Sequence, residues 1–246
     1  MGHPSLVMLA LSGALLGTHC SITEDQRFWY DDGSRRLREV LAKPPVERVA
    51  RNVVLLVGDG MGMSTITAGR IYRGQQLGLN GEEYQLSFEK FSHIGLAKTY
   101  NVDAQVGDSA ACATALFCGV KTKFHRIGVD ASSEGSNCHG GRRLTSLIDW
   151  AQQEGKSTGL ITNTRLTHST PSAAYAHVRE RRWESSTQTG GCKDIAQQLV
   201  EEQPGRSIDV RRTKGGGLPP LLTGGRAALP TGFRHPSLIG HPALFT

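Results

Sequence analysis

The chain has 246 residues, of which 38% are hydrophobic, so it can bury the core of one large domain or two small ones. Its formal charge of +6 does not indicate nucleic-acid binding, because residues 211–246 hold five basic residues and no acidic one, whereas the remainder has 23 basic and 22 acidic residues. Aromatic residues are few and do not alternate with arginines, which also argues against a nucleic-acid partner.

The first twenty residues have the pattern of a secretory signal peptide. Residues 6–17 form an apolar run of about the expected length, and residues 18–20 end in small side chains. The run is too short to span a bilayer. A short buried helix is the alternative, because the start of the chain carries only His3 as a potentially basic side chain.

Strands and helices are expected to alternate along the chain, which predicts an α/β fold with a mostly parallel sheet. The expected strands are residues 52–58, whose continuous apolar run is typical of a strand covered on both faces, then 92–99, 157–162 and 208–210. The expected helices lie around residues 35–41, stopped by Pro44 and Pro45, and at residues 64–74, capped by Ser64, 109–119, 144–153 and 191–202. Residues 211–246 contain seven Gly and five Pro without periodicity and are expected to be irregular or disordered.

A carboxylate follows the first expected strand directly. Asp59 lies at the carboxyl end of that strand, where open parallel sheets bind ligands. The glycines around it allow a tight turn, but Met63 stands where a dinucleotide fingerprint needs a third glycine. We interpret Asp59 as a metal ligand; the alternative is a helix-entry residue with only a capping role.

Ser109 lies at the start of an expected helix, where backbone N–H groups and the helix dipole favour an anion. A serine hydroxyl becomes a good nucleophile when a partner such as bound Zn²⁺ removes or stabilises its proton. One alternative is a plain capping serine. A rival enzymatic interpretation is a serine-esterase elbow, but Ala111 replaces the final glycine of that motif, and only His235 and His241 follow in the irregular tail.

Two further segments contain candidate ligands. His168 and Thr170 lie two residues apart in a loop after a strand and can face one ion, although a loop histidine is more often unremarkable. Arg179, Arg181 and Arg182 form a basic run, and arginine binds phosphate through paired hydrogen bonds. The alternative is a solvated helix face. The sequence alone does not indicate which of the three arginines would bind phosphate.

Four cysteines remain after the signal, and secretion permits disulfides. Four cysteines allow three complete pairings. Cys112 and Cys118 flank the helix that begins at Ser109 and are expected to be buried thiols, which leaves Cys138 and Cys192 as the expected disulfide.

With these elements in this order, the chain resembles the animal alkaline phosphatases from about residue 28 to residue 210, roughly the first half of that family's length. The stretches that carry the resemblance are residues 52–62, 98–101, 108–110, 118–121, 164–165, 168–177 and 191–196. The resemblance implies a three-layer α/β fold, with residues 21–210 as the N-terminal half of the phosphatase domain and residues 211–246 outside it. It also implies hydrolysis of phosphate monoesters through a phosphoserine, with two zinc ions and one magnesium ion.

The resemblance assigns a role to each candidate. Ser109 becomes the nucleophile and a metal contact, and Arg181 clamps the phosphate, thirteen residues after His168. The other roles are Asp108 as the residue that orients the arginine, Asp59 as a bridge between a zinc and the magnesium, His168 and Thr170 as magnesium-site residues, and Cys138 with Cys192 as a family disulfide.

The sequence also departs from the family. Cys112 stands where the family usually has Gly, and Asn137-Cys138-His139 is no glycosylation sequon. The family's second half, with two Asp and three His for the zincs, a Glu for magnesium and a lipid-anchor signal, is not recognisable. The expected protein is therefore a truncated or spliced relative of a secreted or membrane-anchored homodimer, and the alternative function is an inactive secreted fragment that lacks most zinc ligands.

Overall fold

The computed structural model describes residues 25–42, 49–132, 138, 141–185 and 189–213. The chain comprises two units, Met1–Val54 and Leu55–Thr246. The expected signal peptide and the segment after residue 213 lie outside the described residues, so their predictions stay predictions.

Helix α1, Gln26–Leu41, belongs to the first unit and starts nine residues earlier than expected. Asp25 caps it by accepting the Phe28 N–H at 2.9 Å. Arg35 donates to Glu39 at 2.8 Å, one turn further along the helix. None of its residues is buried, so local capping and charge pairs define this helix.

Three helical segments open the second unit. Helix α2 spans Met63–Gln76 and is capped by Gly62 rather than by Ser64, and the 3-10 helix η1 spans Ser87–Lys90. Arg70 Nε donates to Glu89 at 2.9 Å and joins the two. Helix α3, Ser109–Cys118, ends at Gly119 with a left-handed φ of 72°, as its glycine signal predicted.

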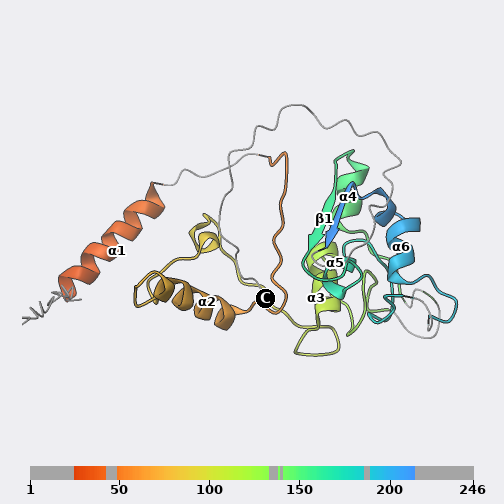
Figure 1. The fold of residues 1–246 in the computed structure, drawn as a ribbon, viewed down its shortest axis with the longest axis horizontal. Helices are drawn as coiled ribbons and strands as arrows, with labels where there is room; N and C mark the ends of the chain where they lie inside the picture. The colour runs from red at the N-terminus through yellow and green to blue at the C-terminus, as the bar shows by residue number, and fades with distance from the viewer. Residues whose placement is uncertain (1–24, 43–48, 133–137, 139–140, 186–188, 214–246) are drawn as a thin grey trace, which may run out of the picture. The chain divides into compact units, whose positions relative to one another are not determined.

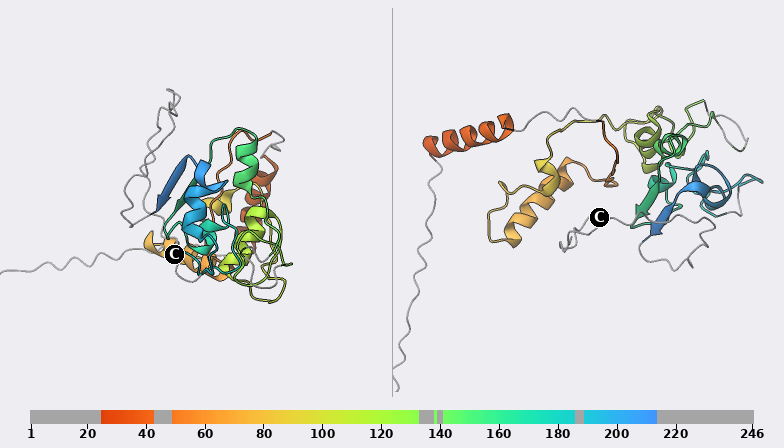
Figure 2. Two further views of the ribbon diagram at one scale, coloured as in Figure 1. Left: turned by 90° about the vertical axis from the view of Figure 1, so that its right-hand side faces the viewer. Right: turned by 90° about the horizontal axis from the view of Figure 1, so that it is seen from above.

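In the described part of the chain, the sheet consists of two parallel strands, β1 Gly159–Thr162 and β2 Val210–Thr213, which lie side by side in Figures 1 and 2. Helix α4 spans Leu147–Gln153, three residues shorter at its start than expected because Ser146 is its cap. The remaining segments are α5 Ser169–Ser172, α6 Ile195–Glu201 and η2 Gly205–Ser207. The α/β class with parallel strands is confirmed.

The core of this unit lies between α3, the segment after α5, and α6. Its largest fully buried side chains include Tyr175, Ile127 and Ile195. Ile127 forms an antiparallel bridge with Val178, and α3 packs against α5. The buried face of α3 carries Ala110, Ala111 and Ala113, small side chains that let α5 pack closely against it.

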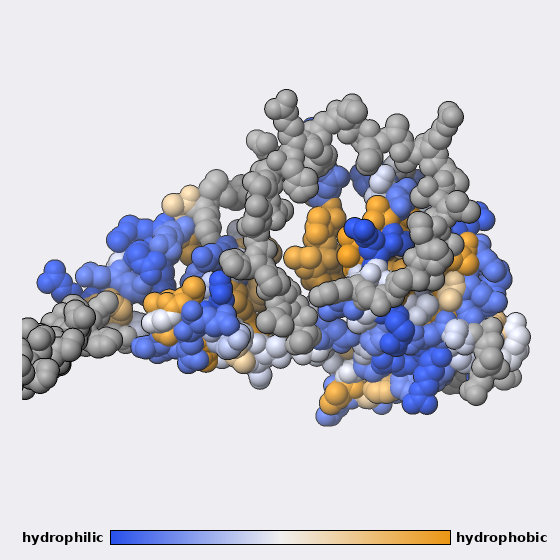
Figure 3. Space-filling view, viewed as in Figure 1, coloured by the Kyte–Doolittle hydropathy of each residue, from blue (hydrophilic) through white to orange (hydrophobic). Residues whose placement is uncertain are grey.

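Two expected strands are not formed. Residues 52–58 and 92–99 have no strand pairing, and Val54 and Ile94 are 84% and 98% exposed. A strand needs a neighbour for its N–H and C=O groups, and the sheet among the described residues contains β1 and β2 alone. Figure 3 shows hydrophobic surface over β1. Ile161, a residue of that strand, is exposed. The three-layer arrangement therefore remains a prediction.

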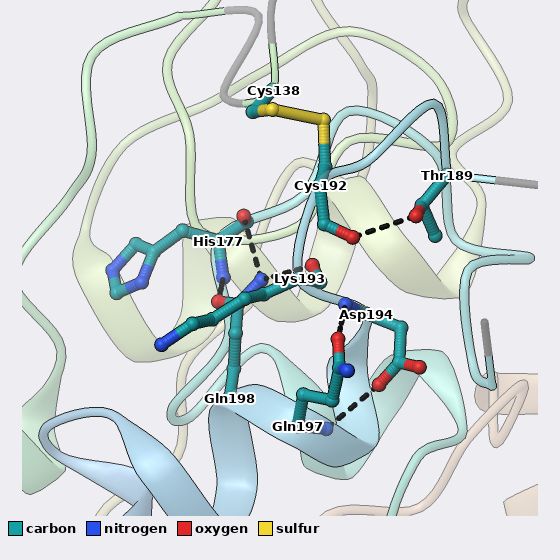
Figure 4. Close-up of a disulfide and its surroundings, with 8 residues drawn as sticks. All are labelled: Cys138, His177, Thr189, Cys192, Lys193, Asp194, Gln197 and Gln198. Atoms are coloured by element: carbon teal, nitrogen blue, oxygen red, sulfur yellow. Dashed lines mark hydrogen bonds between the residues drawn. A yellow bond between two sulfur atoms is a disulfide. The ribbon is translucent and has the colours of Figure 1, made fainter.

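A disulfide joins Cys138 to Cys192, with 5.1 Å between their Cα atoms, as expected (Figure 4). Cys112 and Cys118 are free thiols, and burial raises the pKa of Cys118 to about 12. Beside the disulfide, the Gln198 side chain accepts the His177 N–H at 2.8 Å and donates to the Lys193 carbonyl at 3.1 Å. The crosslink therefore holds the segment that leads into α6. Within the described residues, no helix is both long enough and apolar enough to cross a membrane.

We expect the Cys138→Ser, Cys192→Ser double variant to have a free energy of unfolding about 2–4 kcal/mol lower than the parent chain, because the disulfide closes a loop across 54 positions and restricts the unfolded chain. Urea denaturation measures this difference. Reductant should lower the free energy of unfolding of the parent chain by a similar amount and leave that of the double variant unchanged. A Cys112→Ser variant is the control, and equal stability of parent and double variant would contradict the prediction.

Gly128 is required for the packing around α3. Its φ is 61°, its N–H donates to Thr114 Oγ1 at 3.0 Å, and a Cβ built there lies 2.1 Å from the Ala176 carbonyl oxygen. Gly119 has a similar φ but open space around its Cβ position. A side chain at position 119 would therefore cause backbone strain alone, whereas a side chain at position 128 would cause backbone strain and steric overlap.

Gly128→Ala should cost about 3 kcal/mol or more, because strain and overlap with backbone add, whereas Gly119→Ala should cost about 1 kcal/mol, from the left-handed conformation alone. Thermal and chemical melts of both variants test this. Equal losses at the two positions would show that the contact with Ala176 does not determine the requirement for glycine.

Candidate active site

The Asp108 carboxylate organises the start of α3. Its Oδ1 accepts the Ala111 N–H at 3.2 Å and its Oδ2 accepts the Ala110 N–H at 3.3 Å. Arg181 Nη1 donates to the same Oδ2 at 3.1 Å. The Asp108 side chain is only 6% exposed and that of Arg181 is 24% exposed. An ion pair thus fixes a guanidinium beside a helix N-terminus, two groups that favour an anion.

The structure distinguishes among the three arginines of the basic run. Arg181 donates to Asp108. The Arg179 guanidinium lies 5.0 Å from the centre of the Trp183 ring, and Arg182 is exposed. A guanidinium has five N–H donors, and the Asp108 contact occupies one of them, so Arg181 has the capacity to bind phosphate oxygens.

Ser109 is the first residue of α3 and is half-buried. It directly follows Asp108, so its hydroxyl lies at the same helix end as the Arg181 ion pair. The histidines that the serine-esterase interpretation requires, His235 and His241, lie outside the described residues.

A second pair joins residues 111 positions apart. Thr170 Oγ1 donates to Asp59 Oδ2 at 2.7 Å. Thr170 belongs to α5, and His168 is the residue before that helix. Within the described residues, the buried Nδ1 of His168 has no hydrogen-bond partner. The structure therefore brings two of the expected metal-site residues into contact and places the third at the same helix start.

The Cys112 thiol is influenced by a carboxylate from each of the two pairs, Asp108–Arg181 and Asp59–Thr170. The pKa of its thiol is raised, mainly by burial and then by the negative charges of Asp108 and Asp59, against an opposing effect of Lys121. Asp108 caps α3, and Asp59 contacts Thr170 of α5, which packs against α3. A Cβ at Gly107 would lie 2.3 Å from Cys112 Sγ, so the thiol fills the space that a side chain at position 107 would need.

The side chains of the described residues provide ligands that suit magnesium but too few grouped ligands for zinc. Among them, no group of three or more His, Cys, Asp or Glu side chains is arranged to hold a metal ion. Zinc requires three or four such ligands, so these residues do not form a zinc site by themselves. The Asp59 carboxylate and the Thr170 hydroxyl are oxygen donors, which suit magnesium because that ion keeps several waters and takes one or two carboxylates.

Asn101 is a residue of this site that the sequence did not single out. Its Nδ2 donates to Asp108 Oδ1 at 3.2 Å, and it is 3% exposed. The sequence places Asn101 in a stretch of family resemblance, but a single asparagine in an irregular segment gives no signal for its partner seven residues later.

Asp108→Ala should lower the free energy of unfolding by about 2–4 kcal/mol, because it removes a helix cap and leaves the partly buried Arg181 without its partner. Asp194→Ala is the matched control, because Asp194 caps α6 by accepting the Gln197 N–H at 2.7 Å; loss of a cap costs about 1 kcal/mol. Denaturant titration gives both values. Equal losses would mean that the Arg181 pair adds nothing beyond capping.

The comparisons with known proteins agree on one family. The model of the family "Alkaline phosphatase" matches residues 50–233. Alkaline phosphatase 4 of Drosophila melanogaster is 43% identical over 89% of this chain and 39% of its own length. The human tissue-nonspecific isozyme of alkaline phosphatase is 45% identical over 76% of this chain and 37% of its own length. The chain thus spans about two fifths of the length of these curated relatives.

Among solved structures, the alkaline phosphatase of the Antarctic bacterium TAB5 matches 62% of this chain and 36% of its own, with 29% identity and a TM-score of 0.47. The family match extends over most of the chain and includes both residue pairs described above. The chain belongs to the alkaline phosphatase family.

Proposed function

We propose that this chain supplies the nucleophile and the phosphate-binding arginine of a phosphate-monoester hydrolase. The observation that supports this most directly is the Asp108–Arg181 ion pair at the N-terminus of the helix that begins at Ser109. This arrangement sets a hydroxyl and a guanidinium together at the positive end of a helix dipole, which are groups that an attack on a phosphate ester needs.

In the proposed reaction, Ser109 Oγ attacks phosphorus and the bond between phosphorus and the ester oxygen breaks. The alcohol departs with a proton, and Ser109 carries the phosphoryl group. Water then attacks the same phosphorus, releases inorganic phosphate and returns the proton to Ser109. Arg181 binds the phosphoryl oxygens throughout, and Asp108 keeps the guanidinium in place. The helix N-terminus also stabilises the negative charge.

We infer that Asp59, His168, Thr170 and the Ser109 hydroxyl contribute to metal binding in the active enzyme. The Asp59–Thr170 contact supports a magnesium site with oxygen ligands. We also infer that most zinc ligands come from outside the described residues, since these contain no group of three or more suitable side chains.

The alternative proposal is that the chain is a catalytically inactive secreted fragment. The same finding about metal ligands among the described residues supports it. An oxidising, extracellular location fits both proposals, because a disulfide joins Cys138 and Cys192. Homodimer formation, a signal peptide in residues 1–20, a phosphatase domain over residues 21–210 and a separate tail at residues 211–246 remain proposals.

Incubation of the purified chain with Zn²⁺, Mg²⁺ and an aryl phosphate, followed by acid quenching and peptide mass spectrometry, tests the nucleophile. We expect phosphate attached to Ser109 and its loss in Ser109→Ala and, on metal removal, in the parent chain. Ser207→Ala, at an exposed serine on η2, is the control and should retain the modification. If the metal-loaded parent chain shows no turnover and no phosphoserine, the result supports the inactive alternative.

A further inference from the structure

We propose that Asn101 is a positioning residue for the phosphate-binding arginine: it fixes the Asp108 carboxylate in the one orientation that holds Arg181 at the start of α3. This inference rests on the proposed function for its catalytic meaning, although its structural basis is independent. Asn101 Nδ2 donates to Asp108 Oδ1 at 3.2 Å, on the carboxylate oxygen that Arg181 does not contact.

The pairing on the carboxylate explains why this donor matters. Each Asp108 oxygen receives one helix N–H and one side-chain donor: Oδ1 from Ala111 and Asn101, and Oδ2 from Ala110 and Arg181. The two side-chain donors approach different oxygens and so oppose rotation of the carboxylate group. Without Asn101, Oδ1 keeps only the helix N–H, and rotation moves Oδ2 away from Arg181.

The segment that carries Asn101 is firmly attached, so the amide has a fixed position. The Asn101 N–H donates to the Ala104 carbonyl at 2.9 Å, and the Val102 N–H donates to the Thr122 carbonyl at 3.1 Å. Lys121 Nζ donates to the carbonyls of Lys98 and Tyr100, each at 2.8 Å. The contacts of Val102 and Lys121 tie both sides of Asn101 to the segment that follows α3.

The chemistry of the contact requires an amide rather than a carboxylate. The ionised Asp108 side chain can only accept hydrogen bonds, so the group that faces it must donate. An aspartate at position 101 has the same shape but would place a second carboxylate oxygen about 3 Å from Asp108 Oδ1, where like charges repel inside a buried site. A packing role and a donor role therefore predict opposite outcomes for Asn101→Asp.

The test compares N101A and N101D in the full 246-residue chain, with N80A and N80D at an exposed asparagine as matched controls. Two quantities are measured at one pH: the dissociation constant for inorganic phosphate, by ³¹P NMR, and the rate of rotation about the Nε–Cζ bond of Arg181, by ¹⁵N NMR. The Arg181 signal is assigned from its loss in R181K. Circular dichroism verifies the fold of each variant.

A donor role predicts that N101A weakens phosphate binding about tenfold, the size expected for a hydrogen bond to a charged group, and that Arg181 rotates faster. N101D should be impaired more than N101A in both measurements, and the Asn80 variants should match the parent. If N101D matches the parent while N101A is impaired, Asn101 only fills space and the proposal is overturned. Where N101A does not fold, N101D decides, because it keeps the side-chain volume.

The two readouts separate this inference from the proposed function. If the parent chain does not bind phosphate, the proposed function loses its support, while the Arg181 rotation rates still decide the role of Asn101. Unchanged rotation of Arg181 in both Asn101 variants would overturn the inference whatever the phosphate affinity.

Discussion

The rest of this site depends on the hydrogen bonds and the ion pair that the Asp108 carboxylate accepts. It caps α3, so the helix begins at Ser109, and it pairs with Arg181 from a segment 73 positions later in the chain. One side chain thereby sets the start of the helix, the location of the candidate nucleophile and the location of the candidate phosphate ligand. Because the carboxylate is nearly fully buried, loss of any of its donors is expected to be costly.

The parts of the fold that local signals determine were predictable from sequence. Helix α3 has an aspartate before its first residue and Gly119 after its last, and both boundaries follow from known capping preferences. The strand at Gly159–Thr162 was also expected, and the Cys138–Cys192 disulfide follows from the location of the other two thiols within the helix that begins at Ser109. Such features depend on residues close in sequence or on a small number of combinations.

Other features depend on partners that a single sequence does not identify. The apolar residues 52–58 read as a covered strand, yet strand formation requires a neighbour, and none is paired with them in the described structure. Asn101 contacts Asp108 only because the segment between them folds back, which hydropathy does not reveal. Likewise, the spacing of the arginine run did not select Arg181, whereas its contact with Asp108 does.

A double-mutant cycle between Asp108 and Arg181 tests the central claim most directly. The free energies of unfolding of the parent chain, D108A, R181A and the combined variant give the coupling energy between the two side chains. A fixed, partly buried ion pair predicts a favourable coupling of about 1–3 kcal/mol. A coupling near zero would show that Arg181 is not held by Asp108, and the proposed arrangement of nucleophile and phosphate ligand would lose its basis.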